Sequence, residues 1–296
     1  MPIETRGPMA QKQSERTGYA MVLPYLLHTL LFLGYPLAFA FVLIFHRWNI
    51  YTPMRWVGLA NVKRLVSDPL VRRALGNTLY FLVVHIPLQL ALALSFAYLL
   101  NQRIRARALF RACYFLPVVI SGVVVTILWQ QLYADETGLI NVFLGRMGFA
   151  EVGWLTDPRI AMVSIALMAT WKNVGLYIVL FLVGLQSIPR ELYEAAELDG
   201  ANSWHKFWHI TIPMLNPTIV LVLVLSTIGG FSLFIEPYVL TGGGPVNSTL
   251  SGVLYLYKQA FFFGKMGYAA AIGFFWALII FAVVLLQRRF VEREVA

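Results

Sequence analysis

The sequence predicts an all-α polytopic membrane protein with six transmembrane helices. Hydrophobic residues make up 59% of the 296 residues and charged residues 12%, whereas soluble domains carry about 25% charged residues. The mean hydropathy of +0.71 leaves too little polar surface for a soluble globule of this size. The apolar residues also form six long runs, each near the length of about 20 residues that crosses the hydrocarbon. These observations exclude a soluble enzyme and any disordered or fibrous protein.

The six runs contain a single formal charge, Lys172. Uncharged runs of this length differ from the strands of outer-membrane barrels, which alternate over about 10 residues. Ala38-Phe39-Ala40 is similar to a signal-peptide cleavage site. The apolar run around it exceeds the roughly 7–15 residues of a signal core, so we expect an uncleaved first span. The predicted spans are Gly18–Phe45, Asn77–Leu100, Ala112–Tyr133, Ile160–Ser187, Met214–Ile235 and Tyr268–Leu286.

Six spans place both termini on one side, with a transmembrane domain at 18–287 and tails at 1–17 and 288–296. Lys and Arg favour cytoplasmic loops, and the cluster Arg103-Ile-Arg-Ala-Arg107 points to cytoplasmic termini. The charge count alone does not decide, because the first loop on the opposite side is also basic. The net charge of +9 does not indicate nucleic acid, since the basic residues lie in short gaps rather than on one solvated face. The first loop carries Arg47, Arg55, Lys63, Arg64, Arg72 and Arg73.

The fourth loop, residues 188–213, contains helix signals that the other loops lack. Pro189 and Glu191 suit the first turn of a helix, where the proline loses no hydrogen bond and the acid faces the positive end of the dipole. Residues 190–199 favour helix, and Gly200 is a natural stop. The loop is therefore predicted to begin with a short helix.

A second short helix is predicted after the glycine. Ser203 is the candidate N-cap, and Pro213 is expected to break the chain before the fifth span. Two interpretations are open on physical grounds: the loop docks in a groove of a partner protein, or its apolar face rests on lipid headgroups. That face would carry Trp204, Phe207 and Trp208.

The motif Glu194-Ala-Ala-Glu-Leu-Asp-Gly200, followed by Ile210-Thr-Ile-Pro213, resembles the EAA loop of ATP-binding-cassette importer permeases. It precedes the penultimate span, as in that family, although the leucine before the trailing proline is missing here. The segments 234–245 and 255–261 resemble the sugar-permease branch, and within it the MalF-like rather than the MalG-like subunit. The resemblance covers roughly residues 20–290.

This resemblance implies a multi-pass protein of a bacterial or archaeal cytoplasmic (inner) membrane, with both termini and the fourth loop cytoplasmic. It implies a second, homologous MalG-like permease subunit, two nucleotide-binding ATPase subunits and an extracytoplasmic solute-binding protein as partners, besides membrane lipid. The first loop helix would dock on an ATPase subunit, where Glu194 would meet a basic residue. The implied coupling residues are Glu194, Ala195, Ala196, Leu198, Asp199, Gly200, Trp204, Phe207 and Pro213.

The sequence offers little for chemistry of its own. It contains no Gly-x-x-x-x-Gly-Lys-Ser/Thr phosphate loop, and Gly242-Gly-Gly-Pro245 lacks the following lysine and hydroxyl, so it is interpreted as a turn. His-Glu-x-x-His and Gly-x-Ser-x-Gly motifs are also missing. His205 and His209 share a helix face but have no third ligand nearby in sequence. We therefore expect no catalytic residue, metal or cofactor in this chain, and we assign ATP and Mg to the partner ATPase subunits.

Polar residues within the spans are candidates for the solute pathway, because burying them in lipid is costly. In the fourth span, Trp171, Asn173 and Tyr177 supply the aromatic face and hydrogen-bonding groups typical of carbohydrate sites. Lys172 lies too deep for easy snorkelling, and Gly175 is expected to loosen the helix. The alternative is that the Trp and Tyr residues are ordinary interface anchors.

Two other spans contribute candidates. His85 and Gln89 share a face of the second span, where they line the path or pair with a neighbouring helix. In the fifth span, Phe231 and Phe234 follow the pair Gly229-Gly230, which marks a bend or a close contact. Glu236 lies near the outer end and is expected to be solvated.

The expected function is that of an importer permease subunit which forms half of a pathway for a carbohydrate (a mono-, di- or oligosaccharide, or a related polyol). One alternative is an anionic solute such as a glycerol phosphate, which Lys172 would favour. A second is an ion-driven secondary transporter, which is disfavoured because the predicted spans contain no Asp or Glu.

Overall fold

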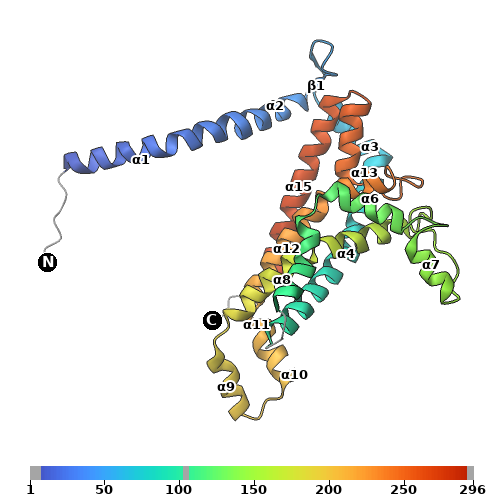
Figure 1. Cartoon of the computed structure of the whole chain (residues 1–296). Helices are drawn as coiled ribbons and strands as arrows, with labels where there is room; N and C mark the ends of the chain where they lie inside the picture. The colour runs from blue at the N-terminus through green and yellow to red at the C-terminus, as the bar shows by residue number, and fades with distance from the viewer. Residues whose placement is uncertain (1–7, 103–106, 292–296) are drawn as a thin grey trace. The chain divides into compact units, whose positions relative to one another are not determined.

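The computed structural model describes residues 8–102 and 107–291 and is largely helical (Figure 1). The outermost parts of both expected tails, and Arg103 and Arg105 of the basic cluster, lie outside the described residues. The chain divides into two compact units, Met1–Leu65 with Gln259–Ala271, and Val66–Lys258 with Ile272–Ala296.

The first unit contains a long apolar helical stretch followed by a small hairpin. The stretch consists of α1 (Pro8–Thr29), the π-helix η1 (Leu30–Gly34) and α2 (Tyr35–Leu43). The strands β1 (His46–Arg47) and β2 (Arg55–Trp56) pair antiparallel and precede α3 (Ala60–Ser67). This two-residue ladder is the one departure from an all-α fold among the described residues.

The second unit is organised around α8 (Ala161–Gln186). Helices α4 (Pro69–Asn101), α5 (Arg107–Val119) and α12 (Asn216–Phe231) pack against it (Figure 1). The shorter elements are α6 (Gly122–Leu132), α7 (Leu139–Arg146), α9 (Arg190–Leu198), α10 (Ser203–Lys206), the π-helix η2 (Phe207–Thr211), α11 (Ile212–Met214), α13 (Ile235–Leu240) and α14 (Gly252–Tyr257). The π-helix η3 (Lys258–Phe262) and α15 (Met266–Val291) each contribute residues to both units.

Five helical stretches of the described chain are long and apolar enough to cross a membrane, and they match five of the six predicted spans. They are Gly18–Leu43, Pro69–Asn101, Ala161–Gln186, Asn216–Leu240 and Met266–Val291.

The third predicted span, Ala112–Tyr133, is not a single straight helix. Helices α5 and α6 are bent by 99° relative to each other, because Ser121 adopts an extended conformation with φ −50° and ψ 131°. Pro117 removes a helical hydrogen bond, and the β-branched residues 118–120 lower the helix propensity before the break. The length of an apolar run does not reveal such a break. The described chain has a sixth candidate span only if the bent pair of α5 and α6 is counted as a single span.

Two glycines on α8 allow its neighbours to approach closely. A Cβ on Gly175 would overlap the backbone carbonyl of Tyr114 on α5, and one on Gly184 would lie 2.5 Å from Thr218 Oγ1 on α12. Small residues have this role in membrane helices, where backbones pack directly on one another. The expectation that Gly175 loosens the helix is therefore wrong, because α8 is continuous from Ala161 to Gln186.

Gly175→Ala should destabilise the protein, because the added methyl group forces α5 away from α8. Overpacking of this kind costs about 1–3 kcal/mol, and thermal unfolding of the purified protein in detergent would measure it. Gly229→Ala is the matched control, since a Cβ there meets no atom within 4 Å. Equal stability of the two variants would contradict the close-contact role of Gly175.

Candidate functional site

A cavity of about 410 Å³ lies between α4, α8, α12 and α13 of the second unit. The double glycine of α12 helps to shape it: Gly230 packs on Leu82 of α4, while Gly229 has open space beside its Cα. The lining residues are Phe81, His85, Ala169, Asn173, Tyr177, Ser226, Gly229, Gly230, Ser232, Leu233, Phe234, Ile235 and Glu236.

Four of the predicted pathway residues, His85, Asn173, Tyr177 and Phe234, line this cavity. The Asn173 amide donates to the carbonyl of Ala169 at 2.9 Å, which leaves its side-chain oxygen as an acceptor. His85 Nδ1 lies 2.8 Å from Thr170 Oγ1. The cavity thus contains both hydrogen-bonding groups and an aromatic ring.

The His85 tautomer follows from its partner. The Thr170 hydroxyl donates to the Ala166 carbonyl at 2.7 Å, so the Nδ1–H of His85 must donate to Thr170. In the neutral ring, Nε2 is then the acceptor. The ring also stacks on Phe81, with centroids 4.8 Å apart, which fixes its plane at the cavity wall.

Three other predicted pathway residues do not line the cavity. Trp171 is 45% exposed and packs against Trp129, 5.4 Å between ring centroids; it lies about 200° around the helix from Asn173. Phe231 is fully buried in the core. Gln89 is buried and accepts a 2.8 Å hydrogen bond from Ser226 Oγ, so it pairs with a neighbouring helix.

Lys172, the remaining candidate, forms an ion pair with Glu236. Its Nζ lies 3.4 Å from Glu236 Oε1, and the two side chains are 14% and 11% exposed. The expectation that Glu236 is solvated is wrong, because α12 ends near Ser232 and the short helix α13 turns the carboxylate toward α8. Glu236 lines the cavity whereas Lys172 does not, so the carboxylate, with its charge compensated, is what the cavity presents.

Two aromatic neighbours of Phe234, Tyr238 and Tyr257, escaped prediction. Phe234, Tyr238 and Tyr257 are mutually packed, with ring centroids 5.0–5.5 Å apart. Tyr257 is the last residue of α14, and only the fold brings it to Phe234. The spacing of Ser226, Gly229 and Gly230 along one face of α12 is the sequence signal that could have revealed this wall of the cavity.

The fourth loop folds as the predicted helix, glycine and helix. Helix α9 begins directly after Pro189 and ends in a left-handed residue, Gly200, with φ +79°. The amide of Ala201 donates to Ala196 at 2.9 Å and that of Gly200 to Glu197 at 3.1 Å. These two bonds form a Schellman motif, in which glycine is the favoured left-handed residue.

The second helix differs from its prediction in two details. Asn202, not Ser203, is the N-cap, since its side chain accepts from the amide of His205 at 2.8 Å. Pro213 does not break the chain, because helical turns continue from α10 through η2 and α11. The amide of Ile212 bonds back to Phe207, and this wider π-turn relieves the clash that a proline ring otherwise causes.

The loop is internally bonded but exposes one surface. Lys206 Nζ contacts Glu197 Oε1 at 2.6 Å, and the hydroxyls of Tyr193 and Thr211 lie 2.9 Å apart. By contrast, Leu198 is 91% exposed. Glu194, Ala195, Asp199 and Gly200 are also exposed, and Ala196 is half-buried. Trp204, Phe207 and Trp208 pack together as expected, with centroids 5.3–6.4 Å apart.

Comparison with known proteins identifies the family. The family model for binding-protein-dependent transport system inner membrane components matches residues 89–295. The chain belongs to this family. It is 37% identical to the arabinooligosaccharides transport system permease protein AraP of Bacillus subtilis, over 95% of this chain and 93% of that one. It is 38% identical to the lactose transport system permease protein LacF of Rhizobium radiobacter, over 91% and 92%.

A solved structure supports the same assignment. One chain of the crystal structure of a bacterial ABC transporter involved in the import of the acidic polysaccharide alginate is similar, with a TM-score of 0.81 and 26% identity. The match covers 97% of this chain and 99% of that one. The membership explains the long apolar helices: the protein is a multi-pass membrane component of an ABC transport system.

The Lys172–Glu236 pair should show a measurable coupling energy. In a double-mutant cycle of Lys172→Met and Glu236→Gln, each single variant leaves one buried charge unpaired. The double variant should therefore be less destabilised than the sum of the singles, with a coupling of about 0.5–3 kcal/mol. Unfolding of the purified protein in detergent would give the four free energies.

The control cycle uses Lys206→Met and Glu197→Gln in the fourth loop, where Glu197 is 62% exposed. Exposed pairs contribute about 0–1 kcal/mol. A coupling at Lys172–Glu236 no larger than this control would mean that the pair does not hold α13 to α8.

Proposed function

We propose that this chain is a permease subunit of a carbohydrate importer and that its cavity is part of the translocation pathway. The observation that carries the proposal is the cavity lining: Asn173, Tyr177, His85 and Ser226 offer hydrogen bonds beside the aromatic group of Phe234. Carbohydrates present hydroxyl groups and apolar ring faces, which match such a lining. Relatives named for arabinooligosaccharide and lactose transport support this class of solute.

The chain would form half of the pathway in a larger assembly. We propose a second, MalG-like permease subunit as the other half, two ATPase subunits that bind ATP and Mg, and an extracytoplasmic solute-binding protein. A structure of the alginate transporter in complex with a periplasmic protein supports a binding protein of this kind. In this arrangement the domain at 18–287 lies in the cytoplasmic membrane, and the loop at 188–213 and both tails lie on the cytoplasmic side.

The fourth loop is proposed to couple the ATPase to the pathway. A coupling element must transmit a push, which a short, internally bonded helix does better than a flexible segment. The exposed side chains of Glu194 and Leu198 on α9 are available to a partner, and Ala195 permits close approach of the two backbones. ATP binding in the partner would then bias the permease between two states.

Two alternatives are less well supported. Lys172 would favour an anionic solute, but this lysine is paired with Glu236, and among the described residues Glu236 is the one formally charged residue that lines the cavity. An ion-driven transporter needs an acid within the spans. The helical stretch Asn216–Leu240 does include Glu236, but that carboxylate already forms an ion pair with Lys172.

Uptake measurements with the complete importer would test this function. Uptake of labelled arabinotriose, lactose, maltose and trehalose identifies a transported sugar in vesicles that contain all subunits. Glu194→Lys combined with Gly200→Pro should then lower ATP-driven uptake at least about tenfold, because loss of a charged contact across an interface costs 2–5 kcal/mol or more and the loop loses its turn.

Glu151→Lys is the control, since Glu151 is exposed and lies outside the fourth loop. This charge reversal should leave uptake unchanged. Full uptake in the loop variant would contradict the coupling role. Failure to accumulate any of the four sugars, together with ATP-driven uptake of an anionic solute such as glycerol phosphate, would contradict the carbohydrate assignment.

A further inference from the structure

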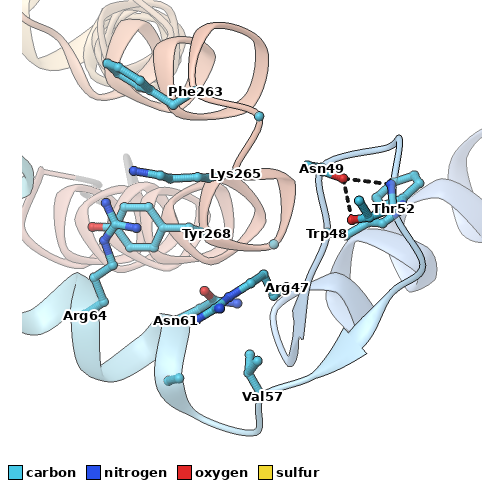
Figure 2. Close-up of a pocket in the computed structure, with 13 residues that line it drawn as sticks. Arg47, Trp48, Asn49, Thr52, Val57, Asn61, Arg64, Phe263, Lys265 and Tyr268 are labelled. Carbon is cyan, nitrogen blue, oxygen red and sulfur yellow. Dashed lines mark hydrogen bonds between the residues drawn. The ribbon is translucent and has the colours of Figure 1, made fainter.

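The basic first loop has no role in the proposed pathway, yet two of its arginines, Arg47 and Arg64, line one pocket together with Lys265. This pocket belongs to the first unit and has a volume of about 410 Å³. Arg47 comes from β1, Arg64 from α3 and Lys265 from the turn before α15 (Figure 2). No Asp or Glu occurs among the described residues that line it.

The walls of the pocket are held by hydrogen bonds. The Asn61 amide donates to the carbonyls of Ile44 and His46, at 2.8 and 3.0 Å. The amide of Met266 donates to the carbonyl of Trp48 at 3.0 Å. Gly267 lies so close to the His46 carbonyl that a Cβ would not fit. The pocket is thus preformed between the hairpin, α3 and the start of α15.

The chemistry of the lining favours a phosphate group. The guanidinium of Arg64 lies 4.0 Å from the centre of the Tyr268 ring, and Lys265 Nζ lies 5.4 Å from that of Phe263. Among the described residues, no carboxylate lies within 4 Å of the charged groups of Arg47 or Lys265. Guanidinium groups bind phosphate oxygens through paired hydrogen bonds, and a concave site with cations alone attracts an anion.

The position of the pocket along the chain gives the depth. One part of its lining, residues 47–64, follows Leu43, the last residue of the first candidate span, and the other part, residues 263–268, includes the start of the last candidate span at Met266. A helix that crosses the hydrocarbon ends at the level of the lipid headgroups, so we infer that depth for the pocket. Exposed aromatic side chains, which are typical of the membrane–water interface, surround the same segments: Tyr51, Trp56, Phe261, Phe262 and Phe263.

We propose that this pocket binds the phosphate of an anionic phospholipid headgroup, which anchors the hairpin to the membrane. The orientation in the proposed function places this pocket at the outer leaflet. The binding of the lipid by the pocket does not depend on that orientation. A free phosphate ion offers the same chemistry, and the acidic surface of a partner protein offers a carboxylate instead. The pocket lies beside the ends of two candidate spans, and exposed aromatic side chains surround it. Both features favour the lipid over a free phosphate ion or a partner protein.

Native mass spectrometry of the importer complex that contains the full chain would test the proposal. The complex in detergent is titrated with phosphatidylglycerol and, separately, with phosphatidylcholine. Phosphatidylglycerol should be retained preferentially, and Arg47→Gln and Lys265→Gln should each weaken its apparent affinity about fivefold, the effect typical of one basic residue at a membrane surface. Arg55→Gln should leave the affinity unchanged. Arg55 is opposite Arg47 in the β1–β2 ladder but does not line the pocket.

Three results would overturn the proposal. One is an unchanged phosphatidylglycerol affinity in both pocket variants, with the complex intact by mass and by thermal unfolding. Another is an affinity for inorganic phosphate equal to the affinity for the lipid, with the same dependence on Arg47. That result would indicate a site for a free anion. The third is weaker capture of the solute-binding protein by the variants with lipid retention unaffected, which would indicate a protein contact. Since lipid retention is measured without transport, a failure of the carbohydrate assignment would not alter the result.

Discussion

The close packing of α8 against its neighbours is the constraint on which the second unit depends. Gly175 and Gly184 remove the side chains that would hold α5 and α12 away from it. Lipid tails are as apolar as the helices, so close backbone contact and interhelical polar pairs, rather than the hydrophobic effect, hold the bundle together. The same helix carries Asn173 and Tyr177 into the cavity. Helix packing and the cavity lining therefore both depend on α8, whose different faces contact α5, α12 and the cavity.

A continuous apolar core joins the cavity to the fourth loop. Tyr177, Phe181 and Leu185 of α8 pack in the same cluster as Ile188, which precedes α9, and Leu215, which precedes α12. In the proposed mechanism, a displacement of α9 would reach the cavity through these packed side chains. Transitions of this kind occur because packed interfaces have discrete arrangements rather than deforming gradually. The break between α5 and α6 and the Lys172–Glu236 ion pair lie next to the cavity. A change between two packing arrangements would alter the cavity at these two places.

Apolar run length and local helix signals predicted most of the fold. Five spans and the helix–glycine–helix loop depend on properties within about 20 neighbouring residues, which the sequence displays directly. The missed features depend on contacts between distant residues. Glu236 is paired because α13 turns it toward Lys172, and Phe231 is buried because it faces the bundle rather than the cavity. Helical periodicity separates Trp171 from Asn173 by about 200°, but it does not say which face meets the cavity, so the prediction that groups the two residues rests on their chemistry alone.

The central claim is that the cavity beside Asn173 opens alternately to the two sides of the membrane as the partner ATPase binds ATP. Cysteine accessibility tests it directly, because Cys113 is the only cysteine in the chain and Cys113→Ser gives a clean background. Asn173→Cys in that background is treated from outside with a membrane-impermeant thiol reagent, in vesicles that contain the whole importer. The account predicts a labelling rate that changes at least about tenfold between the nucleotide-free and ATP-bound states. An equal rate in both states would contradict it.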